Sequence, residues 1–410
     1  MQITQKIRIF PTPEQQEILN VLSEKCRLIY NFALKERIDK WENERKTASY
    51  IEQQNKLPEI KKQYPEYKWV YSKVLQMVLR TLDADFKSFY ALRKKDENAS
   101  PPRFKGKKYF TTMVYNQSGF KVHGYKITLS QNYNNEIPLE FTTEFSFDEC
   151  KIKQVTVFKK DDKYFLSIAY EIEEKEYIDN LKYQAIDLGV SNIVTAVNTN
   201  GKFIQIPNNR ADKYWQPKIE QLQSRADHCK KDSIKWKMLN DRLHKMKRKC
   251  ANQLKDFQHK LSKEIVENTK ANTIIVGDLD VKDMSSKKQG QKKRDRSLHR
   301  AMQNTGCLSR FVQFLTYKAK IIGKKVIEIN ERYTSKTCYA CGKKHDMKLY
   351  KRNMKCDCGN NMDRDKNSAI NIMIRFLSQN AYVDGLDIFM SNLRKTGEKS
   401  SQEAPCVSVG

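Results

Sequence analysis

The first hundred residues combine one strand-like stretch with two long stretches of helical periodicity. Residues 2–10 have the pattern of a strand, and a proline follows them. Residues 12–15 (TPEQ) supply an N-cap, a first-turn proline and a capping-box glutamine, so a helix is expected to begin there. A second helix is expected over about residues 69–95, after a stretch that contains a loop. Residues 12–99 are therefore predicted to form a helical lobe.

A segment rich in turn formers and lysine separates these helices from a β-rich region. Apolar and polar residues clearly alternate over residues 155–158 and 164–172, which predicts two strands with a turn between them. In the segment 101–110 (PPRFKGKKYF) aromatic and basic residues are interleaved, which suits base stacking and phosphate contact. A solvated basic loop fits this segment equally well.

The second half of the chain has a different order of elements. A short apolar run ends at Asp187, a strand follows over residues 193–197, and the pair Asn200-Gly201 predicts a tight hairpin. Helix and buried strand then alternate, with helix expected over residues 214–268, strand over 273–279, helix over 300–323 and strand over 325–330. The first of these helical stretches is expected to break around residues 229–233, and a last helix is expected over residues 367–377. Meander, helix, strand, helix, strand is the order of an RNase H-type fold. Such folds cut nucleic acid with three or four carboxylates that hold divalent metal.

Three acidic stretches could supply these carboxylates. They contain Asp187 (QAIDLGVSN), Glu331 (INERYTSKTC) and Asp365 (MDRDKNSAIN). Hard divalent cations prefer oxygen ligands, and two of them clamp the attacking and leaving oxygens of a phosphodiester. Each acid alone would be read as a solvated charge or a helix cap. The three together predict a Mg²⁺ (or Mn²⁺) site in which all three residues are catalytic and ligate the metal.

Four of the ten cysteines form a separate pattern, Cys338-x-x-Cys341 followed by Cys356-x-Cys358. Two close pairs supply the four thiolates of a closed tetrahedral Zn²⁺ site. Because such a site has no open position, the zinc is expected to be structural and not to take part in cutting. The other six cysteines are scattered, which indicates a reducing cytoplasm rather than a disulfide framework.

Composition indicates the class of partner. The 410 residues include 77 Lys and Arg against 49 Asp and Glu, a formal net charge of +28, and so strong a basic excess favours a polyanion such as nucleic acid. No apolar run approaches the ~20 residues that span a bilayer, and the N-terminus has no signal-peptide pattern. We expect a prokaryotic cytoplasmic protein that is nucleoid-associated when bound and has no membrane partner.

The segments YTSKTCYACG, CDCG and DRDKNSAINI, within residues 333–372, resemble the transposon-encoded TnpB (OrfB) proteins. These are RNA-guided DNA nucleases with a RuvC-like domain, related to type V CRISPR effectors, and the resemblance covers nearly the whole chain. It implies an α+β multidomain protein with an N-terminal β-barrel that a helical lobe interrupts. The implied parts are a wedge-like barrel (1–11 and 100–180), a helical recognition lobe (12–99), an RNase H-type, RuvC-like nuclease domain (181–332 and 361–392), a zinc-ribbon insertion (333–360) and a disordered tail (393–410).

The resemblance also implies the partners, a guide RNA from the transposon end and double-stranded target DNA. The barrel would grip the guide and, with the helical lobe, would read a short motif beside the target. The Lys-rich helices of residues 214–262 would lie along the heteroduplex. Residues 281–300 are either a flexible lid over the substrate or a disordered insertion.

One position departs from the family pattern. Most members have a glutamate before the Asp-Leu pair of the middle strand, where this chain has Gly277 followed by Asp278. Asp278 is a poor substitute because strand side chains alternate between faces. Glu331 ends the adjacent strand, about 4.8 Å away, and is long enough to lean over a glycine. Some relatives resemble this arrangement, so Glu331 is expected to replace the missing ligand.

The expected function is that of an RNA-guided, metal-dependent DNA endonuclease, a hydrolase that cuts target DNA next to a short motif. The alternative is a nuclease-inactive, RNA-guided DNA-binding transcriptional repressor of the same family. Gly277 is the sequence feature that favours the repressor, whereas the retained Asp187 and Asp365 oppose it. A strand-transfer transposase is a third idea, but no tyrosine or second acidic constellation can be picked out for it.

Overall fold

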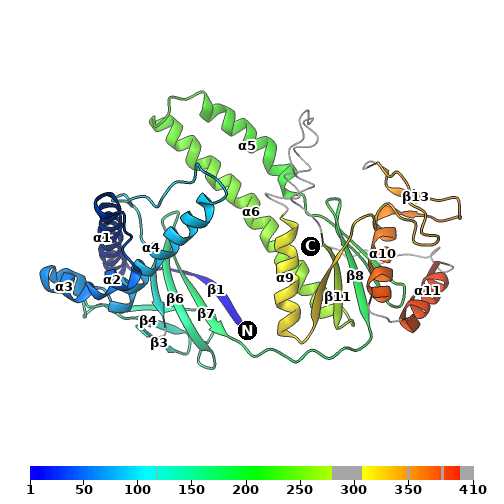
Figure 1. Cartoon of the computed structure of the whole chain (residues 1–410), viewed down its shortest axis with the longest axis horizontal. Coiled ribbons are helices and arrows are strands. Elements are labelled where there is room, and N and C mark those ends of the chain that lie inside the picture. Colours follow the sequence, from blue (N-terminus) through cyan, green and yellow to red (C-terminus); the bar gives the residue numbers. More distant parts are fainter. Residues whose placement is uncertain (117, 279–306, 349–350, 380–382, 398–410) are drawn as a thin grey trace. The chain divides into compact units, whose positions relative to one another are not determined.

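The computed structural model describes residues 1–116, 118–278, 307–348, 351–379 and 383–397 (Figure 1). Its internal contacts divide the chain into two compact units, Met1–Glu173 and Glu174–Gly410. Each unit has its own sheets and its own cores. Within the described ranges, none of the helices combines the length and the apolar character that a bilayer crossing requires.

The helices of the first unit begin where the sequence predicts. The capping box at the start of α1 (Pro13–Glu44) is formed, since the backbone N–H of Gln15 donates to Thr12 Oγ1 at 3.3 Å and that of Thr12 to Gln15 Oε1 at 3.1 Å. The second long helix is α4 (Ser72–Arg93). The stretch between them is more helical than expected, because Ser49 caps one helix and prolines occupy the first turns of two others. These short elements are α2 (Tyr50–Asn55), α3 (Leu57–Gln63) and the 3₁₀ helix η1 (Pro65–Trp69).

The strands of the first unit form two separately hydrogen-bonded sheets. The four-stranded sheet has the order β1-β7-β6-β2 and consists of β1 (Gln2–Ile9), β7 (Lys163–Glu171), β6 (Lys151–Lys160) and β2 (Met113–Asn116). The three-stranded sheet consists of β3 (Phe120–His123), β4 (Lys126–Leu129) and β5 (Leu139–Thr142). One hydrophobic core joins α1 and α4 to strands of both sheets. Closure of these strands into a barrel stays a prediction.

The second unit is built on the mixed five-stranded sheet that the order of elements predicts. Its strand order is β10-β9-β8-β11-β12, from β8 (Tyr183–Leu188), β9 (Asn192–Asn198), β10 (Phe203–Pro207), β11 (Thr273–Asp278) and β12 (Lys325–Asn330). The first three strands form an antiparallel meander, and β11 pairs in parallel with both β8 and β12. Parallel pairing requires crossover connections, which helices supply.

Helices cover both faces of this sheet (Figure 1). Strand alternation sends Ile186 and Val276 to one face, where they pack with α6 (Ile234–Asn268) and α9 (Leu308–Ile321). It sends Ala185 and Ile275 to the other, against α10 (Arg364–Gln379) and α11 (Val383–Gly397). The preceding helix α5 (Ala211–Asp227) packs along α6, and the predicted break between these two helices is present.

Two boundaries near the C-terminus differ from the sequence prediction. The helix expected from residue 367 begins at Arg364, and α11 reaches Gly397, so residues 393–397 do not belong to a disordered tail. Leu393, only 8% exposed, is part of the core beside α10, which is why the helix continues. Residues 398–410 and the segment 281–300 lie outside the described residues. A small antiparallel pair joins β13 (Asn353–Lys355), within the predicted zinc ribbon, to β14 (Asn361–Asp363), which directly follows its predicted end.

Candidate functional site

The three predicted carboxylates lie where two strand ends meet the start of α10. Asp187 is near the end of β8, Glu331 directly follows β12, and Asp365 is in the first turn of α10. A hydrogen bond joins the helix to the sheet at this point, because Ser368 Oγ donates to Asp187 Oδ1 at 2.8 Å. Residues far apart in the sequence therefore gather at one end of the RNase H-type sheet.

Asp187 is affected by both other carboxylates. Burial raises its pKa well above the usual range, the charge of Glu331 raises it further, and the charge of Asp365 adds to both. The hydrogen bond from Ser368 and the charge of Arg364 oppose this rise. Like charges in a buried site are unfavourable unless a cation lies between them. A cation between these carboxylates would relieve their repulsion.

Glu331 occupies the space that a side chain at residue 277 would fill. A Cβ built on Gly277 would overlap Oε2 of Glu331 and would lie 3.0 Å from its Cβ and 3.2 Å from its Cδ. The lean over the glycine that the sequence predicts is thus present in the structure. Oε2 of Glu331 is buried without a hydrogen-bond partner in the described part of the chain. Burial, followed by the charge of Asp278, raises the pKa of Glu331 to about 7.

Asp278 has a different environment from Glu331. It is exposed, it is paired with Asn330 in the sheet register, and alternation assigns it to the face of Val276. That Asp278 points away from the other carboxylates stays a prediction, since its charge acts on Glu331 and raises the pKa of that residue.

The carboxylates are more widely spaced than the cysteines. Among the residues that the structure describes, the four cysteines are the group of potential ligands whose donor atoms all lie within 4.8 Å of one another. The unpartnered buried oxygen and the all-oxygen donor set fit hard divalent cations.

Two arginines that sequence reasoning missed lie beside Asp365. Arg352 Nη1 is 3.8 Å from Asp365 Oδ2, and Arg364 Nη2 is 3.5 Å from Oδ1. Arg364 directly precedes Asp365 in the sequence. Arg352 comes from the ribbon region, where it directly precedes β13, and no local pattern in the sequence indicates that it lies beside Asp365.

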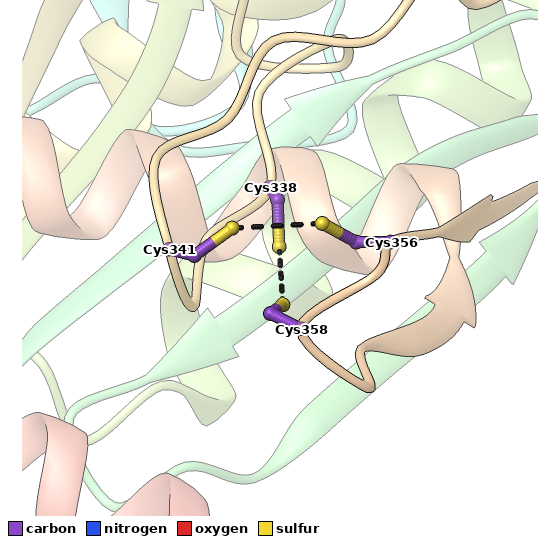
Figure 2. A group of neighbouring side chains, drawn as sticks. All are labelled: Cys338, Cys341, Cys356 and Cys358. Carbon is purple, nitrogen blue, oxygen red and sulfur yellow. Dashed lines mark hydrogen bonds between the residues drawn. The ribbon is translucent and has the colours of Figure 1, made fainter.

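The predicted zinc ligands converge as the spacing requires (Figure 2). Sγ of Cys338 lies 3.6 Å from that of Cys358, and Sγ of Cys341 lies 3.5 Å from that of Cys356. Each pair ends in a glycine with positive φ, +73° at position 342 and +92° at position 359, a conformation that favours glycine. A closed cluster of four cysteines fits structural zinc.

Local hydrogen bonds favour the thiolate form of Cys338. Burial alone would raise its pKa, but the hydrogen bond from Asn360 Nδ2 to its Sγ at 3.3 Å and those from two backbone amides lower the pKa to about 7. Zinc binds thiolates, so this environment suits a ligand.

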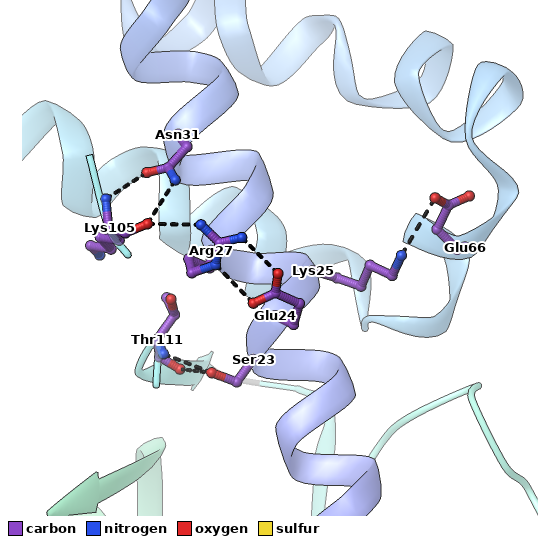
Figure 3. Close-up of polar contacts among 8 residues, drawn as sticks. All are labelled: Ser23, Glu24, Lys25, Arg27, Asn31, Glu66, Lys105 and Thr111. Atoms are coloured by element: carbon purple, nitrogen blue, oxygen red, sulfur yellow. Dashed lines mark hydrogen bonds and ion pairs between the residues drawn. The ribbon is translucent and has the colours of Figure 1, made fainter. Parts of the chain in front are cut away.

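In the first unit, the basic segment of residues 101–110 is fastened to α1 (Figure 3). Arg27 Nη1 and Asn31 Nδ2 donate to the carbonyl of Lys105 at 2.7 and 2.9 Å, and the N–H of Lys105 donates to Asn31 Oδ1 at 2.8 Å. Further along, Ser23 and Thr111 exchange hydrogen bonds. These contacts hold the backbone of the segment in place.

Basic and aromatic side chains surround a cavity of about 620 Å³ next to this segment. Trp69 and Tyr133 meet edge to face at 4.9 Å, and Lys25 Nζ lies 5.2 Å from the ring centre of Trp69. Aromatic rings on which a base can stack, with lysines beside them that can contact phosphate, are suited to a nucleotide. The basic and aromatic lining residues are Lys25, Trp69, Lys107, Lys108, Tyr109, Phe110, Tyr133 and Lys159.

Comparison with known proteins gives matches along most of the chain. The family model described as "Probable transposase" matches residues 167–302, a "Helix-turn-helix domain" model matches 1–46, and the model "Cas12f1-like, TNB domain" matches 309–372. A Streptomyces pristinaespiralis protein named as an RNA-guided DNA endonuclease is 28% identical over 407 residues, 98% of this chain and 95% of that protein. The Escherichia coli (strain K12) protein InsQ, with the same description, is 26% identical and covers 82% of each chain.

Further similarities extend to viral proteins and to a solved structure. The TnpB-like protein L79 of Acanthamoeba polyphaga mimivirus is 37% identical over 146 residues, 35% of this chain and 26% of that protein. The protein in a cryo-EM structure of a Cas12f1-sgRNA-target DNA complex shares the fold, with a TM-score of 0.59 and 12% identity over 91% of this chain and 98% of that one. These matches and the motifs of residues 333–372 show that the chain is similar to the TnpB (OrfB) proteins along most of its length.

Proposed function

We propose that the protein is an RNA-guided, metal-dependent DNA endonuclease that a transposon encodes and that cuts target DNA next to a short motif. The observation that carries the proposal is the placement of Glu331 over Gly277, at the same end of the sheet as Asp187. A site that had lost its function would have no need to keep a buried, unpartnered carboxylate oxygen among like charges.

Asp187, Glu331 and Asp365 would be the catalytic residues and would hold Mg²⁺ or Mn²⁺. Metal ions bound there would activate water and stabilise charge on the attacking and leaving oxygens of the phosphodiester. Ser368 orients Asp187 through its hydrogen bond. Arg352 and Arg364, beside Asp365, are placed to orient that carboxylate or to meet a phosphate of the DNA backbone. Zn²⁺ held by Cys338, Cys341, Cys356 and Cys358 would be structural.

The guide RNA and double-stranded target DNA would bind to the basic surfaces. In the first unit, the cavity lined by Lys107 and Tyr109 suits an unstacked base and its phosphate. The wedge-like barrel, its helical lobe and the domain boundaries expected from the sequence form part of this proposal. The net charge of +28 favours a polyanionic partner.

The test uses protein co-purified with its native guide RNA and a matched plasmid that carries a randomised flank. We expect linear plasmid with Mg²⁺ and none with EDTA. Asp187→Ala should abolish cutting without releasing the DNA, because it removes a metal ligand and leaves the nucleic-acid surfaces intact. Tight guide-dependent binding with no strand cut under any divalent metal would instead identify an RNA-guided repressor.

A further inference from the structure

One side of α10 carries a row of polar side chains at helical spacing. Asn367, Asn371 and Arg375 are each four residues apart, so they lie on one side of the helix, and Ser368 adjoins them. All four make hydrogen bonds to neighbouring residues of the second unit. We call these four residues the α10 row.

At one end of the row, Arg375 holds the backbone carbonyls of the two residues on either side of Glu331. Its Nη2 donates to the carbonyl of Arg332 at 3.1 Å, and its Nη1 donates to the carbonyl of Asn330. Glu331 follows the last residue of β12, so the sheet ladder does not hold it as it holds residue 277. A ligand moved from the middle of a sheet to a position beyond a strand end needs another support, and Arg375 provides it.

The two asparagines continue the same attachment towards the cysteines. Asn371 Nδ2 donates to the carbonyls of Thr334 and Thr337 at 2.8 and 2.7 Å, and Asn367 Nδ2 donates to the same two carbonyls at 3.4 and 2.7 Å. Asn367 is 0% exposed. Its Oδ1 accepts from the backbone N–H of Tyr339 at 3.1 Å, next to the zinc ligand Cys338.

Asn360 completes the connection to the cysteine cluster. Its Nδ2 lies 3.4 Å from Asn367 Oδ1 and 3.3 Å from the Sγ of Cys338. A continuous set of hydrogen bonds therefore runs from a zinc ligand through α10 to the peptides around Glu331.

Ser368 lies between the carboxylate of Asp187 and Thr334, which is three residues after Glu331. Its Oγ donates to Asp187 Oδ1 and lies 2.9 Å from Thr334 Oγ1, which in turn donates to the carbonyl of Glu331 at 2.8 Å. Thr334 and Ser368 are both buried. Two adjacent hydroxyl groups thus lie between the backbone of Glu331 and the carboxylate of Asp187, and their two protons serve two of the three contacts at a time.

We propose that the α10 row is a set of positioning residues that holds Glu331 over Gly277 and ties its placement to the fold of the zinc ribbon. The inference rests on the proposed function, since it concerns the geometry of the same carboxylates. It assigns a role to residues that touch neither zinc nor the carboxylate of Glu331. Groups that orient metal ligands typically change metal affinity or activity by roughly 10- to 100-fold when altered.

The test measures metal binding directly, by Mn²⁺ titration followed by electron paramagnetic resonance, in the full protein with its zinc bound. Asn371→Asp keeps the size of the side chain but turns a carboxylate oxygen towards two carbonyls. We expect Mn²⁺ affinity to fall by roughly 10- to 100-fold, while zinc content and guide-dependent DNA binding stay at the level of the unmodified protein. The matched control is Asn392→Asp, because Asn392 on α11 donates to the carbonyl of Thr199 at 3.1 Å and is not in the row. It should bind Mn²⁺ normally.

A second variant covers the case in which Asn371→Asp does not fold. Arg375→Lys keeps the positive charge, but a lysine cannot bridge the carbonyls of Asn330 and Arg332 as the planar guanidinium does. It should weaken Mn²⁺ binding in the same direction. Normal Mn²⁺ affinity in folded Arg375→Lys, and in Asn371→Asp if that variant folds, would overturn the inference.

A double-mutant cycle separates positioning from a general loss of stability. If the row acts through Glu331, then Asn371→Asp, or Arg375→Lys in its place, should reduce Mn²⁺ affinity no further once Glu331→Gln is present. Additive losses in the cycle would overturn the inference. Failure of the unmodified protein to cut DNA would refute the proposed function alone, because the Mn²⁺ titration does not depend on cutting.

Discussion

The cysteine cluster and the carboxylate site are both metal-site candidates, yet they are built in opposite ways. The four cysteines lie within 21 residues of sequence, on two tight turns that place all four sulfurs within 4.8 Å of one another. The carboxylates come from two strand ends and a helix start, and they are more widely spaced. Local turns bring the four cysteines into a closed ligand shell. The carboxylate site is instead assembled from distant elements, so it depends on the packing of the sheet against α10.

The difference has a consequence for how each site can change. In a closed four-thiolate shell every ligand is needed, so the local spacing is constrained. In the assembled site a ligand can move to a neighbouring strand, because side chains from adjacent strands reach the same space. Under the proposed function Gly277 and Glu331 would be such a case, since the longer side chain occupies the space above the glycine.

The largest expected effect is at the cysteine cluster. Cys338→Ser should lose the bound zinc, about one ion per chain, and with it soluble protein and DNA cutting, because the ribbon separates Glu331 from Asp365. Zinc content by mass spectrometry and a solubility assay measure this. Cys229→Ser, a cysteine outside the cluster, is the control and should behave normally. A zinc-free preparation that cuts at full rate with Mg²⁺ would contradict a structural role.

The next largest effect separates the two sites. Glu331→Gln keeps the size of the side chain and removes its charge, so we expect DNA cutting to fall by roughly 10³-fold or more, equivalent to at least about 4 kcal/mol. Guided DNA binding and zinc content should not change. Asp278→Asn is the matched control because Asp278 is exposed on the other face. Normal cutting by Glu331→Gln, together with inactive Asp278→Asn, would assign the role to Asp278.

A smaller effect is expected at the glycine itself. The Cβ of Gly277→Ala would overlap Oε2 of Glu331 and would lie 3.0 Å from its Cβ, so the carboxylate must shift. Because the side chain can turn aside, we expect cutting to fall by roughly 10- to 100-fold rather than to disappear. Gly106→Ala is the control, since a Cβ there meets nothing within 4 Å. Initial rates of plasmid cutting at several Mg²⁺ concentrations measure the change.

Moving the ligand back would sharpen the same point. Gly277→Glu combined with Glu331→Ala places a carboxylate on the middle strand and removes the clash. It should cut faster than Glu331→Ala alone. Equal rates for the two proteins would show that the middle strand can no longer hold the ligand.

The smallest expected effect concerns pH. Folding raises the pKa of Glu331 from 4.5 to about 7 and raises that of Asp187. Between these values the folded protein binds protons that the unfolded chain has released, so in EDTA the free energy of unfolding should fall as pH rises from about 4.5 to 7. Thermal scans should show a falling midpoint over this range and recovery on adding Mg²⁺ at pH 7.5. Glu331→Gln should flatten the dependence, and an equally steep curve in that variant would assign it to other groups.

Sequence reasoning succeeded where the signal is local. The capping box at Thr12, the hairpin after β9 and the paired cysteines each depend on neighbouring residues, and the structure contains all three. Periodicity also predicted the order of the five strands and the break between α5 and α6. Periodicity did not predict α2, α3 or the end of α11. These helical segments are short or weakly patterned, and packing stabilises them.

The sequence by itself thus determined the four-cysteine cluster and the mixed α/β fold class, and it singled out the three acids that stay a prediction as metal ligands, because motif spacing and apolar periodicity are properties of the chain. The tertiary structure alone decided that Glu331 lies over Gly277 with an unpartnered oxygen, that Arg352 approaches Asp365, and that the α10 row holds the segment between the two sites. These are contacts between elements that are distant in sequence. Strand register and the packing of α10 on the sheet set them, and no local pattern in the chain encodes either one.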